Sequence, residues 1–179
     1  MRSRFLLIPA AICAGTVAGG PAYGGAFYLN IEQAQQLLFP KASFEEDFHI
    51  LTDDQIKAIQ TDSDVSVTDR KVRLWKVSSG ESFYIDQVIG LNSDVTYAVG
   101  VNSKGQVTGI EILECWEHYD QVRHPLWRAQ FTGKKRGDTL DNGKEGIEKI
   151  SGTTLSSVHI TEGVRRILST HAVLQGAKL

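Results

Sequence analysis

The stretch TYAVGVNSKGQVTGIEILE, residues 96–114, constrains the fold of this chain more than any other. Tyr97, Val99 and Val101 alternate with other residues before an Asn-Ser-Lys-Gly turn, and Val107 to Leu113 is again rich in apolar residues. A period of two on both sides of a glycine-containing turn predicts an antiparallel β-hairpin. Residues 71–77 and 82–90 flank a Ser-Ser-Gly turn and predict two further strands. We therefore expect an antiparallel sheet of about four or more strands.

Helices are expected on both sides of these strands in the chain. Apolar residues at helical spacing predict a short helix within residues 30–40, ended by a proline. Thr52 and Gln55 form a capping-box pattern for a second helix, from Asp53 to about Gln60. A last helix is expected to begin near Leu155, with its apolar residues on one face. The predicted fold class is α+β, an antiparallel sheet with flanking helices.

The length and charge of the chain limit the classes of protein to which it can belong. A chain of 179 residues suggests one domain with a sizeable core. We expect a helical segment over residues 27–70 and the main domain over residues 71–179. The formal net charge of −2, with no run of lysine or arginine, gives no electrostatic reason to expect nucleic-acid binding.

Residues 1–26 have the order of a secretory signal peptide. Arg2 and Arg4 precede an apolar run from Phe5 to about Cys13, and small residues follow. The apolar run is too short for a transmembrane helix of ~20 residues. We expect cleavage between Ala22 and Ala26 and a mature protein in the periplasm or another extracytoplasmic space.

The segment from Glu114 to Lys149 mixes aromatic residues, charges and glycines without a steady period. A stretch of this length with little regular structure inside a domain is often a functional loop. It leads directly into a cluster of small residues, SGTT at 151–154, in front of the last helix.

Two interpretations of this cluster are open on the residues alone. One of Ser151, Thr153 or Thr154 could cap the helix, with Gly152 supplying backbone freedom. Alternatively, the free N–H groups and partial positive charge of the helix N-terminus could bind a phosphate. A lone cluster of this kind is weak evidence for phosphate, because it lacks the lysine of a P-loop.

The segment ISGTTLSS resembles the flavinylation signature of the FMN-binding domain family. This family occurs in subunits of sodium-pumping NADH:quinone oxidoreductase, in Rnf-type complexes and in stand-alone exported flavoproteins. Its pattern is an acidic residue, two intervening residues, Ser or Thr, Gly, Ala, and Thr or Ser. Here the pattern falls on Glu148, Ser151, Gly152, Thr153 and Thr154, with Glu in place of the usual Asp and Thr153 in place of the usual Ala. The hairpin, the segment WRAQFTGKK and the last helix follow the family order over roughly residues 83–174.

The resemblance implies that Thr154 carries FMN through a phosphoester bond made by a dedicated flavin transferase. It implies a phosphate at the helix N-terminus, and it places the segment of Glu114 near the flavin ring. Trp127 is an aromatic residue that could stack on this ring or belong to the core. Phe131 is interpreted as ordinary core. The implied cofactor-binding residues are Thr154, Ser151, Gly152, Thr153, Leu155, Ser156, Glu114 and Trp127.

The function implied by the resemblance is electron transfer outside the cytoplasm, with a membrane or periplasmic redox partner. Two alternatives remain at this stage. In one, the protein is an exported binding module without redox function, and SGTT only caps a helix. In the other, it is a flavin reductase acting on a small substrate, so whether the protein is itself an enzyme is left open.

Overall fold

The computed structural model describes residues 26–91, 93–117, 121–141 and 146–176. The expected signal peptide, residues 1–26, lies outside the described residues except for Ala26.

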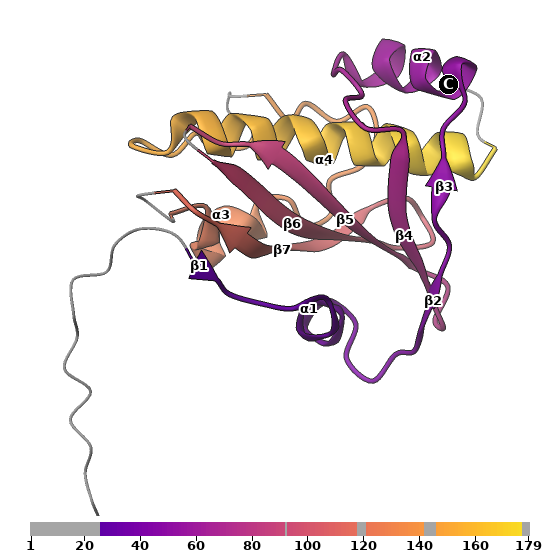
Figure 1. Ribbon diagram of the computed structural model, residues 1–179, viewed down its shortest axis with the longest axis horizontal. Helices are drawn as coiled ribbons and strands as arrows, with labels where there is room; N and C mark the ends of the chain where they lie inside the picture. Colours follow the sequence, from indigo (N-terminus) through magenta and orange to yellow (C-terminus); the bar gives the residue numbers. More distant parts are fainter. Residues whose placement is uncertain (1–25, 92, 118–120, 142–145, 177–179) are drawn as a thin grey trace, which may run out of the picture.

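One antiparallel sheet forms the centre of the molecule (Figure 1). The strand order is β1-β7-β6-β5-β4-β2, and β3 also pairs with β4. The strands are β1 (Ala26–Phe27), β2 (Phe44–Glu46), β3 (His49–Ile50), β4 (Lys71–Val77), β5 (Ser82–Ile89), β6 (Asp94–Val101) and β7 (Val107–Cys115). The α+β fold class, with an antiparallel sheet and flanking helices, is confirmed.

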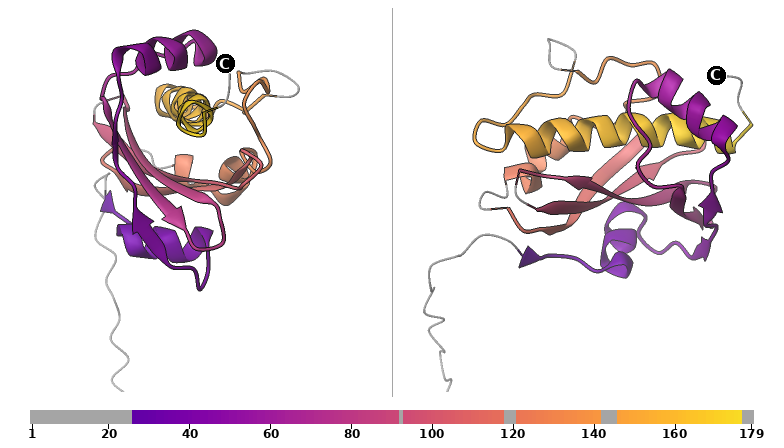
Figure 2. Two further views of the ribbon diagram at one scale, coloured as in Figure 1. Left: turned by 90° about the vertical axis from the view of Figure 1, so that its right-hand side faces the viewer. Right: turned by 45° about the horizontal axis from the view of Figure 1, so that its top comes forward.

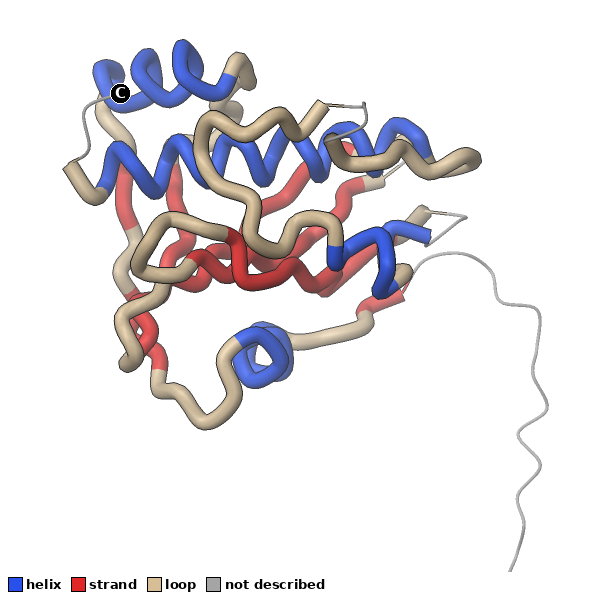
Figure 3. The backbone as a smooth tube through the Cα atoms, turned by 180° about the vertical axis from the view of Figure 1, so that it is seen from behind, coloured by secondary structure: helices blue, strands red, loops and turns tan. Residues whose placement is uncertain are grey.

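Helices cover both faces of this sheet (Figure 2). The helical elements are α1 (Ile31–Leu38), α2 (Asp53–Ser63), the 3-10 helix η1 (Gln121–Arg123), α3 (Pro125–Ala129) and α4 (Thr154–Leu174). The long helix α4 crosses one face, with α2 beside it, and α1 lies on the opposite face. The loop between α3 and α4 runs back along α4 to the start of that helix (Figure 3), and Asp141 in this loop pairs with Arg165 of α4 at 3.0 Å.

Strand alternation divides the apolar side chains between two cores. On β6, Tyr97 and Val99 face α4 and pack with Val164, whereas Ala98 packs with the cluster on the side of α1. Because successive side chains of a strand point to opposite faces, the alternation that predicted the hairpin places side chains in both cores. The hairpin also contains two register irregularities between β6 and β7, which the pattern did not predict.

The N-terminal segment, residues 27–70, contains more than the expected helices. Both predicted helices are present, and the capping box of Thr52 and Gln55 is formed in both directions. The second helix continues to Ser63, three residues beyond the expected end, and stops where Asp64 adopts a left-handed backbone conformation with φ 54°. The segment also supplies β2 and β3, which both pair with β4.

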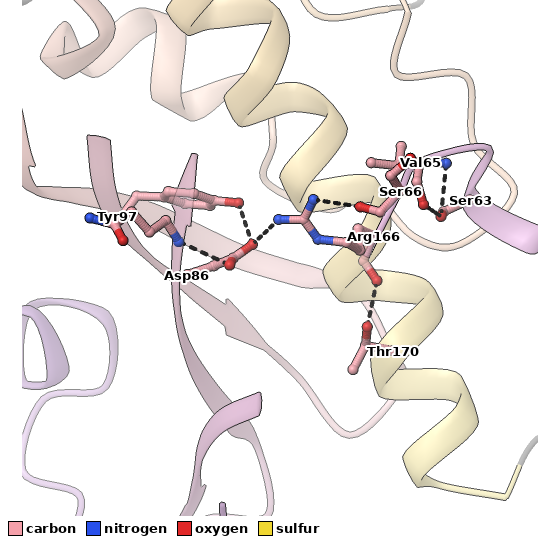
Figure 4. A network of polar contacts seen from close by, with 8 residues as sticks. Ser63, Val65, Ser66, Asp86, Tyr97, Arg166 and Thr170 are labelled. Carbon is pink, nitrogen blue, oxygen red and sulfur yellow. Dashed lines mark hydrogen bonds and ion pairs between the residues drawn. The ribbon is translucent and has the colours of Figure 1, made fainter. Parts of the chain in front are cut away.

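A partly buried polar network connects α4 to the sheet (Figure 4). The Tyr97 hydroxyl on β6 donates to Asp86 Oδ2 on β5 at 2.9 Å, and the Arg166 guanidinium on α4 binds the same oxygen at 2.7 Å. Arg166 also donates to the carbonyl of Ser66 at 3.1 Å, which ties in the loop after α2. Burial raises the pKa of Tyr97 well above 10, so its hydroxyl stays protonated as a donor. The network therefore sets the position of the helix that begins at Thr154.

Candidate functional site

The first residues of α4 form a helix N-terminus without a side-chain cap. Gly152 turns the chain with a φ of +89°, a conformation that L side chains rarely adopt. Thr153 is the N-cap residue, with φ −128° and ψ 35°, but its side chain accepts no capping hydrogen bond. The leading N–H groups of a helix have no partner within the helix, and their partial positive charge favours an anion. The structure therefore does not show SGTT as a simple capping motif, because the N-cap side chain binds none of the leading N–H groups.

The two threonines of the cluster differ in accessibility. The Thr154 side chain is exposed, and its hydroxyl donates to the Ile150 carbonyl at 3.0 Å. Thr153 is 6% exposed, and its hydroxyl oxygen is buried without a hydrogen-bond partner among the described residues. Of the two hydroxyls, only that of Thr154 is reachable from solvent in this conformation.

The neighbouring serines and Leu155 have separate environments. Ser151 is exposed, Leu155 is 40% exposed and Ser156 is buried. Ser157 is also buried, and its hydroxyl donates to the Thr154 carbonyl at 2.9 Å and accepts the Ile150 N–H at 3.3 Å. These two bonds close the turn around Gly152 and hold Thr154 at the surface.

A cavity of about 660 Å³ opens next to this turn. Ile150 shows that the cavity adjoins Thr154. It lines the cavity, and its carbonyl accepts the Thr154 hydroxyl at 3.0 Å. Pockets for small molecules and cofactors are typically ~300–1,000 Å³. The lining residues are Gln121, His124, Leu126, Trp127, Gln130, Glu148, Lys149 and Ile150.

Helix α3 forms one wall of the cavity and holds the opposite wall in place. The Trp127 indole N–H donates to the Glu148 carbonyl at 2.8 Å, and the Gln130 side chain accepts the Glu148 N–H at 2.9 Å. Trp127 is 5% exposed and packs edge-on against Phe131, with ring centroids 5.1 Å apart. Phe131 is fully buried, as expected of a core residue, whereas Trp127 has one side on the cavity.

Glu114 lies apart from this cavity. It is near the end of β7, where its carboxylate accepts the indole N–H of Trp116, and it is not among the described lining residues. The structure thus brings Trp127 together with the SGTT turn but does not bring Glu114 to the same cavity. No finding tests the role assigned to either residue, so both remain predictions.

Several polar lining residues were not assigned to the cofactor site from the sequence. Gln121, His124, Gln130 and Lys149 come from η1, the region of α3 and the segment before α4. A Cβ at Gly152 would lie 3.7 Å from the Gln121 Oε1, so η1 also borders the turn. These elements are short and have no steady hydrophobic period. The only sequence signal for them was that they belong to a long segment rich in aromatic and charged residues.

Comparison with known proteins identifies the segment that carries this site. Residues 90–169 match the FMN-binding domain family. This segment is similar to FMN-binding domains. The matched range runs from the turn before β6 into α4, so it includes both walls of the cavity and the SGTT turn. The resemblance stated from the signature is confirmed.

The chain is also similar to one component of an oxidoreductase complex. It is 22% identical over 184 residues to a subunit of the Na+-translocating ferredoxin:NAD+ oxidoreductase complex of Acetobacterium woodii. The similarity covers 93% of this chain and 87% of that protein. It therefore extends beyond the FMN-binding domain to the N-terminal strands and helices.

Two further features of the described residues bear on the site. None of the helices described here is both long enough and apolar enough to cross a bilayer. Within the same residues, no group of three or more histidine, cysteine, aspartate or glutamate side chains is arranged to hold a metal ion.

Proposed function

We propose that this protein is an exported flavoprotein that carries FMN as a phosphoester on Thr154 and transfers electrons outside the cytoplasm. The observation that carries the proposal is the exposed Thr154 hydroxyl at an uncapped helix N-terminus, next to a cavity large enough for a cofactor. The FMN-binding domain match and the similarity to a component of an oxidoreductase complex support the assignment.

The N-terminus of α4 is suited to the FMN phosphate. In the ester, Thr154 Oγ1 becomes the bridging oxygen, and the non-bridging oxygens carry the negative charge. The helix dipole and the leading N–H groups stabilise this charge, since the N-cap side chain does not already bind them. Gly152 has no side chain within the turn, so a phosphate can approach the backbone there.

The cavity is suited to the flavin ring. Trp127, Leu126 and Ile150 offer apolar surface, while Gln121, His124 and Lys149 offer polar groups at the edges. FMN supplies the redox chemistry when bound, and the chain supplies binding, orientation and the local charge. A covalent link also keeps the cofactor on a protein that works where free flavin is scarce.

Thr153 distinguishes this chain from the usual family pattern, which has alanine there. Its hydroxyl is buried and has no partner among the described residues, so the additional oxygen is enclosed rather than presented to a transferase. The enclosed position of this hydroxyl favours Thr154 over Thr153 as the attachment residue. The proposal also calls for a flavin transferase that accepts the signature with threonine at position 153.

The test is the intact mass of the protein after acid denaturation, exported from a host with an active flavin transferase. We expect a gain equal to FMN less one water in the wild type and in Thr153→Ala, and the unmodified mass in Thr154→Ala. The assignment would be overturned if Thr154→Ala still gained the mass of FMN. It would also be overturned if the wild type and both threonine variants all kept the unmodified mass. The same spectrum reports export, because cleavage between Ala22 and Ala26 gives a defined loss of mass.

A second measurement separates an electron carrier from a small-substrate reductase. The flavinylated protein is reduced chemically and mixed with soluble acceptors such as fumarate or ferricyanide. A carrier passes electrons to a one-electron acceptor without selective turnover of an organic substrate. Sustained and selective turnover that is abolished by Thr154→Ala would instead identify a reductase.

A further inference from the structure

A separate cavity of about 480 Å³ lies near the C-terminal end of α4, where Leu168, His171 and Ala172 line it. At a rise of ~1.5 Å per residue, His171 lies about 26 Å along the helix from Thr154. Figure 1 shows the start of α4 at the left of the molecule and its end at the right. The volume is within the range of ligand pockets, ~300–1,000 Å³. This cavity is therefore a candidate binding site that is independent of the SGTT turn.

Two hairpin turns and a loop supply the other walls of this cavity. The β4–β5 turn forms one wall, the β6–β7 turn contributes Lys104, and the segment after α3 contributes Lys135 and Arg136. The backbone N–H of Lys104 donates to the Asn102 side chain at 2.9 Å, and Lys135 forms a β-bridge with Gln106. These contacts fix the backbone of both segments. The three cationic side chains therefore start from fixed positions around one cavity.

The charges on the lining of this cavity are of one sign. Lys104, Lys135 and Arg136 line it, and no carboxylate is among the described lining residues. Arg136 also pairs with Asp62 at 3.3 Å, whereas neither lysine forms an ion pair within the described part of the chain. The carboxylate of Asp138 accepts the backbone N–H of Lys135 at 3.0 Å from outside the lining. A concave site lined by one sign of charge concentrates ions of the opposite sign, here anions.

His171 adds a buried hydrogen-bond donor to this cavity. It is 9% exposed, and its Nδ1 lies 2.9 Å from the Tyr84 hydroxyl. Burial raises the pKa of Tyr84 and lowers the pKa of His171, so near neutral pH the phenol is protonated and the imidazole is uncharged. With the phenol as donor to Nδ1, the imidazole carries its proton on Nε2. A Cβ at Gly105 would lie 3.9 Å from His171 Cδ2, the atom beside Nε2, so this edge of the ring faces the β6–β7 turn that lines the cavity.

We propose that this cavity binds an anion that carries a phosphate group. A phosphate monoester has a charge of about −1.5 to −2 at pH 7 and three strong acceptor oxygens. The cavity offers it two lysines without an ion pair and the Nε2–H of His171, for which the described residues provide no acceptor. Arg136 adds further donors beside them. A single carboxylate, with one charge and two oxygens, would match this set of donors less well.

This site goes beyond the proposed electron transfer and does not require FMN, whose phosphate would lie at the other end of α4. A bound phosphate group connects the β6–β7 turn, the segment after α3 and the end of α4, which are distant from one another in the chain. It therefore stabilises the folded protein, since a ligand that binds only the folded state shifts the unfolding equilibrium. The same group can come from a soluble phosphate ester or from a lipid headgroup, and the experiment below distinguishes the two sources.

The test is isothermal titration calorimetry of the exported protein with inorganic phosphate and with glycerol 3-phosphate, at constant ionic strength. We expect saturable binding of both. The double variant Lys104→Gln, Lys135→Gln should raise the Kd at least about tenfold, the cost of one lost charge-assisted hydrogen bond. His171→Phe should also raise the Kd, because it keeps a ring but removes the Nε2–H. The matched control Lys57→Gln, Lys71→Gln removes two exposed lysines of α2 and β4 outside the cavity and should bind as the wild type does.

Backbone amide NMR then locates the bound phosphate. The signals of residues 103–105 and 135–136 should shift, and shifts confined to residues 151–156 would overturn the proposal. So would the absence of saturable binding, an equal loss in the control variant, or tighter binding of succinate than of phosphate.

Flotation with vesicles of phosphatidylcholine and phosphatidic acid separates the two sources of the phosphate group. Vesicle binding that the double lysine variant abolishes supports a lipid headgroup as the ligand, and phosphate binding without flotation supports a soluble ester. The intact mass of the same sample shows whether FMN is present, so failure of this proposal is distinct from failure of the flavin assignment.

Discussion

The Tyr97 hydroxyl on β6 occupies the space where a side chain at Gly163 of α4 would begin. A Cβ built on Gly163 would lie 1.9 Å from that oxygen and 3.2 Å from a methyl of Val88. The hydroxyl is fixed at this point by its bond to Asp86, and Tyr97 is fully buried. The close approach of helix and sheet therefore requires glycine at this position.

Gly163→Ala should lower the free energy of unfolding by about 2 kcal/mol, because steric overlap in the core outweighs the better helix propensity of alanine. Urea denaturation measures this change. In a Tyr97→Phe background, which lacks the hydroxyl, the same substitution should cost clearly less. Equal costs in both backgrounds would show that the Tyr97 oxygen is not what excludes a side chain at residue 163.

Asp86→Ala should destabilise the protein by roughly 3 kcal/mol, because it leaves the Arg166 guanidinium and the Tyr97 hydroxyl without their shared acceptor in a largely buried site. The matched control is Asp53→Ala, which breaks an exposed pair with Arg70 and should cost less than about 1 kcal/mol. If both variants cost the same in urea denaturation, the network of Asp86, Tyr97 and Arg166 does not hold α4 on the sheet.

Thr153→Val should leave the unmodified protein as stable as the wild type or more stable by about 1 kcal/mol. The substitution keeps the branched shape and removes a buried hydroxyl that has no partner among the described residues. Ser157→Ala is the contrast, since it removes a hydroxyl with two hydrogen bonds and should be destabilising by about 1 kcal/mol. Thermal unfolding of protein from a strain without a flavin transferase compares the two. A larger loss for Thr153→Val than for Ser157→Ala would mean that the Thr153 hydroxyl has a partner in solution.

Stability should fall as the pH drops below about 6.5, in part because of His171. Burial lowers the pKa of this histidine below its usual value of 6.5, and its Nδ1 lies 2.9 Å from the buried Tyr84 hydroxyl. Above pH 6.5 the imidazole is neutral in both states, so it contributes no pH dependence. Below that value the unfolded chain binds a proton that the folded protein binds less readily, and the free energy of unfolding decreases. Urea denaturation between about pH 7.5 and 5.5 should show a shallower slope for His171→Gln, and an unchanged slope would contradict this account.

The sequence was sufficient where structure follows from local pattern. Alternation over residues 96–114 predicted the β6–β7 hairpin, and Thr52 with Gln55 predicted the start of α2. Both signals act between residues that are close in the chain, through the pleat of a strand or through the free N–H groups of a helix. The segment ISGTTLSS is similarly local, and the match of residues 90–169 to the FMN-binding domain family confirms the resemblance drawn from it.

The sequence could not assign the partners that lie far apart in the chain. Residues 27–70 were expected to be helical, yet β1 pairs with β7 and β2 with β4 because the edges of the sheet offered free hydrogen-bonding groups. The cavity beside Thr154 is built from η1, α3 and residues 148–150, which have no shared period. Glu114, which the family resemblance placed near the flavin ring, lies near the end of β7 beside Trp116 and is not among the residues that line this cavity, so its role stays a prediction.

What the sequence determined by itself is therefore the type of each regular element and the position of the SGTT turn, since hydrophobic period and capping are properties of neighbouring residues. Only the tertiary structure decided which threonine is exposed and which side chains line the cavity. These depend on burial, and the burial of a residue is decided by elements that pack against it from distant parts of the chain. Thr153 and Thr154 are adjacent and chemically identical, yet the packing of α4 on the sheet encloses one hydroxyl and leaves the other at the surface.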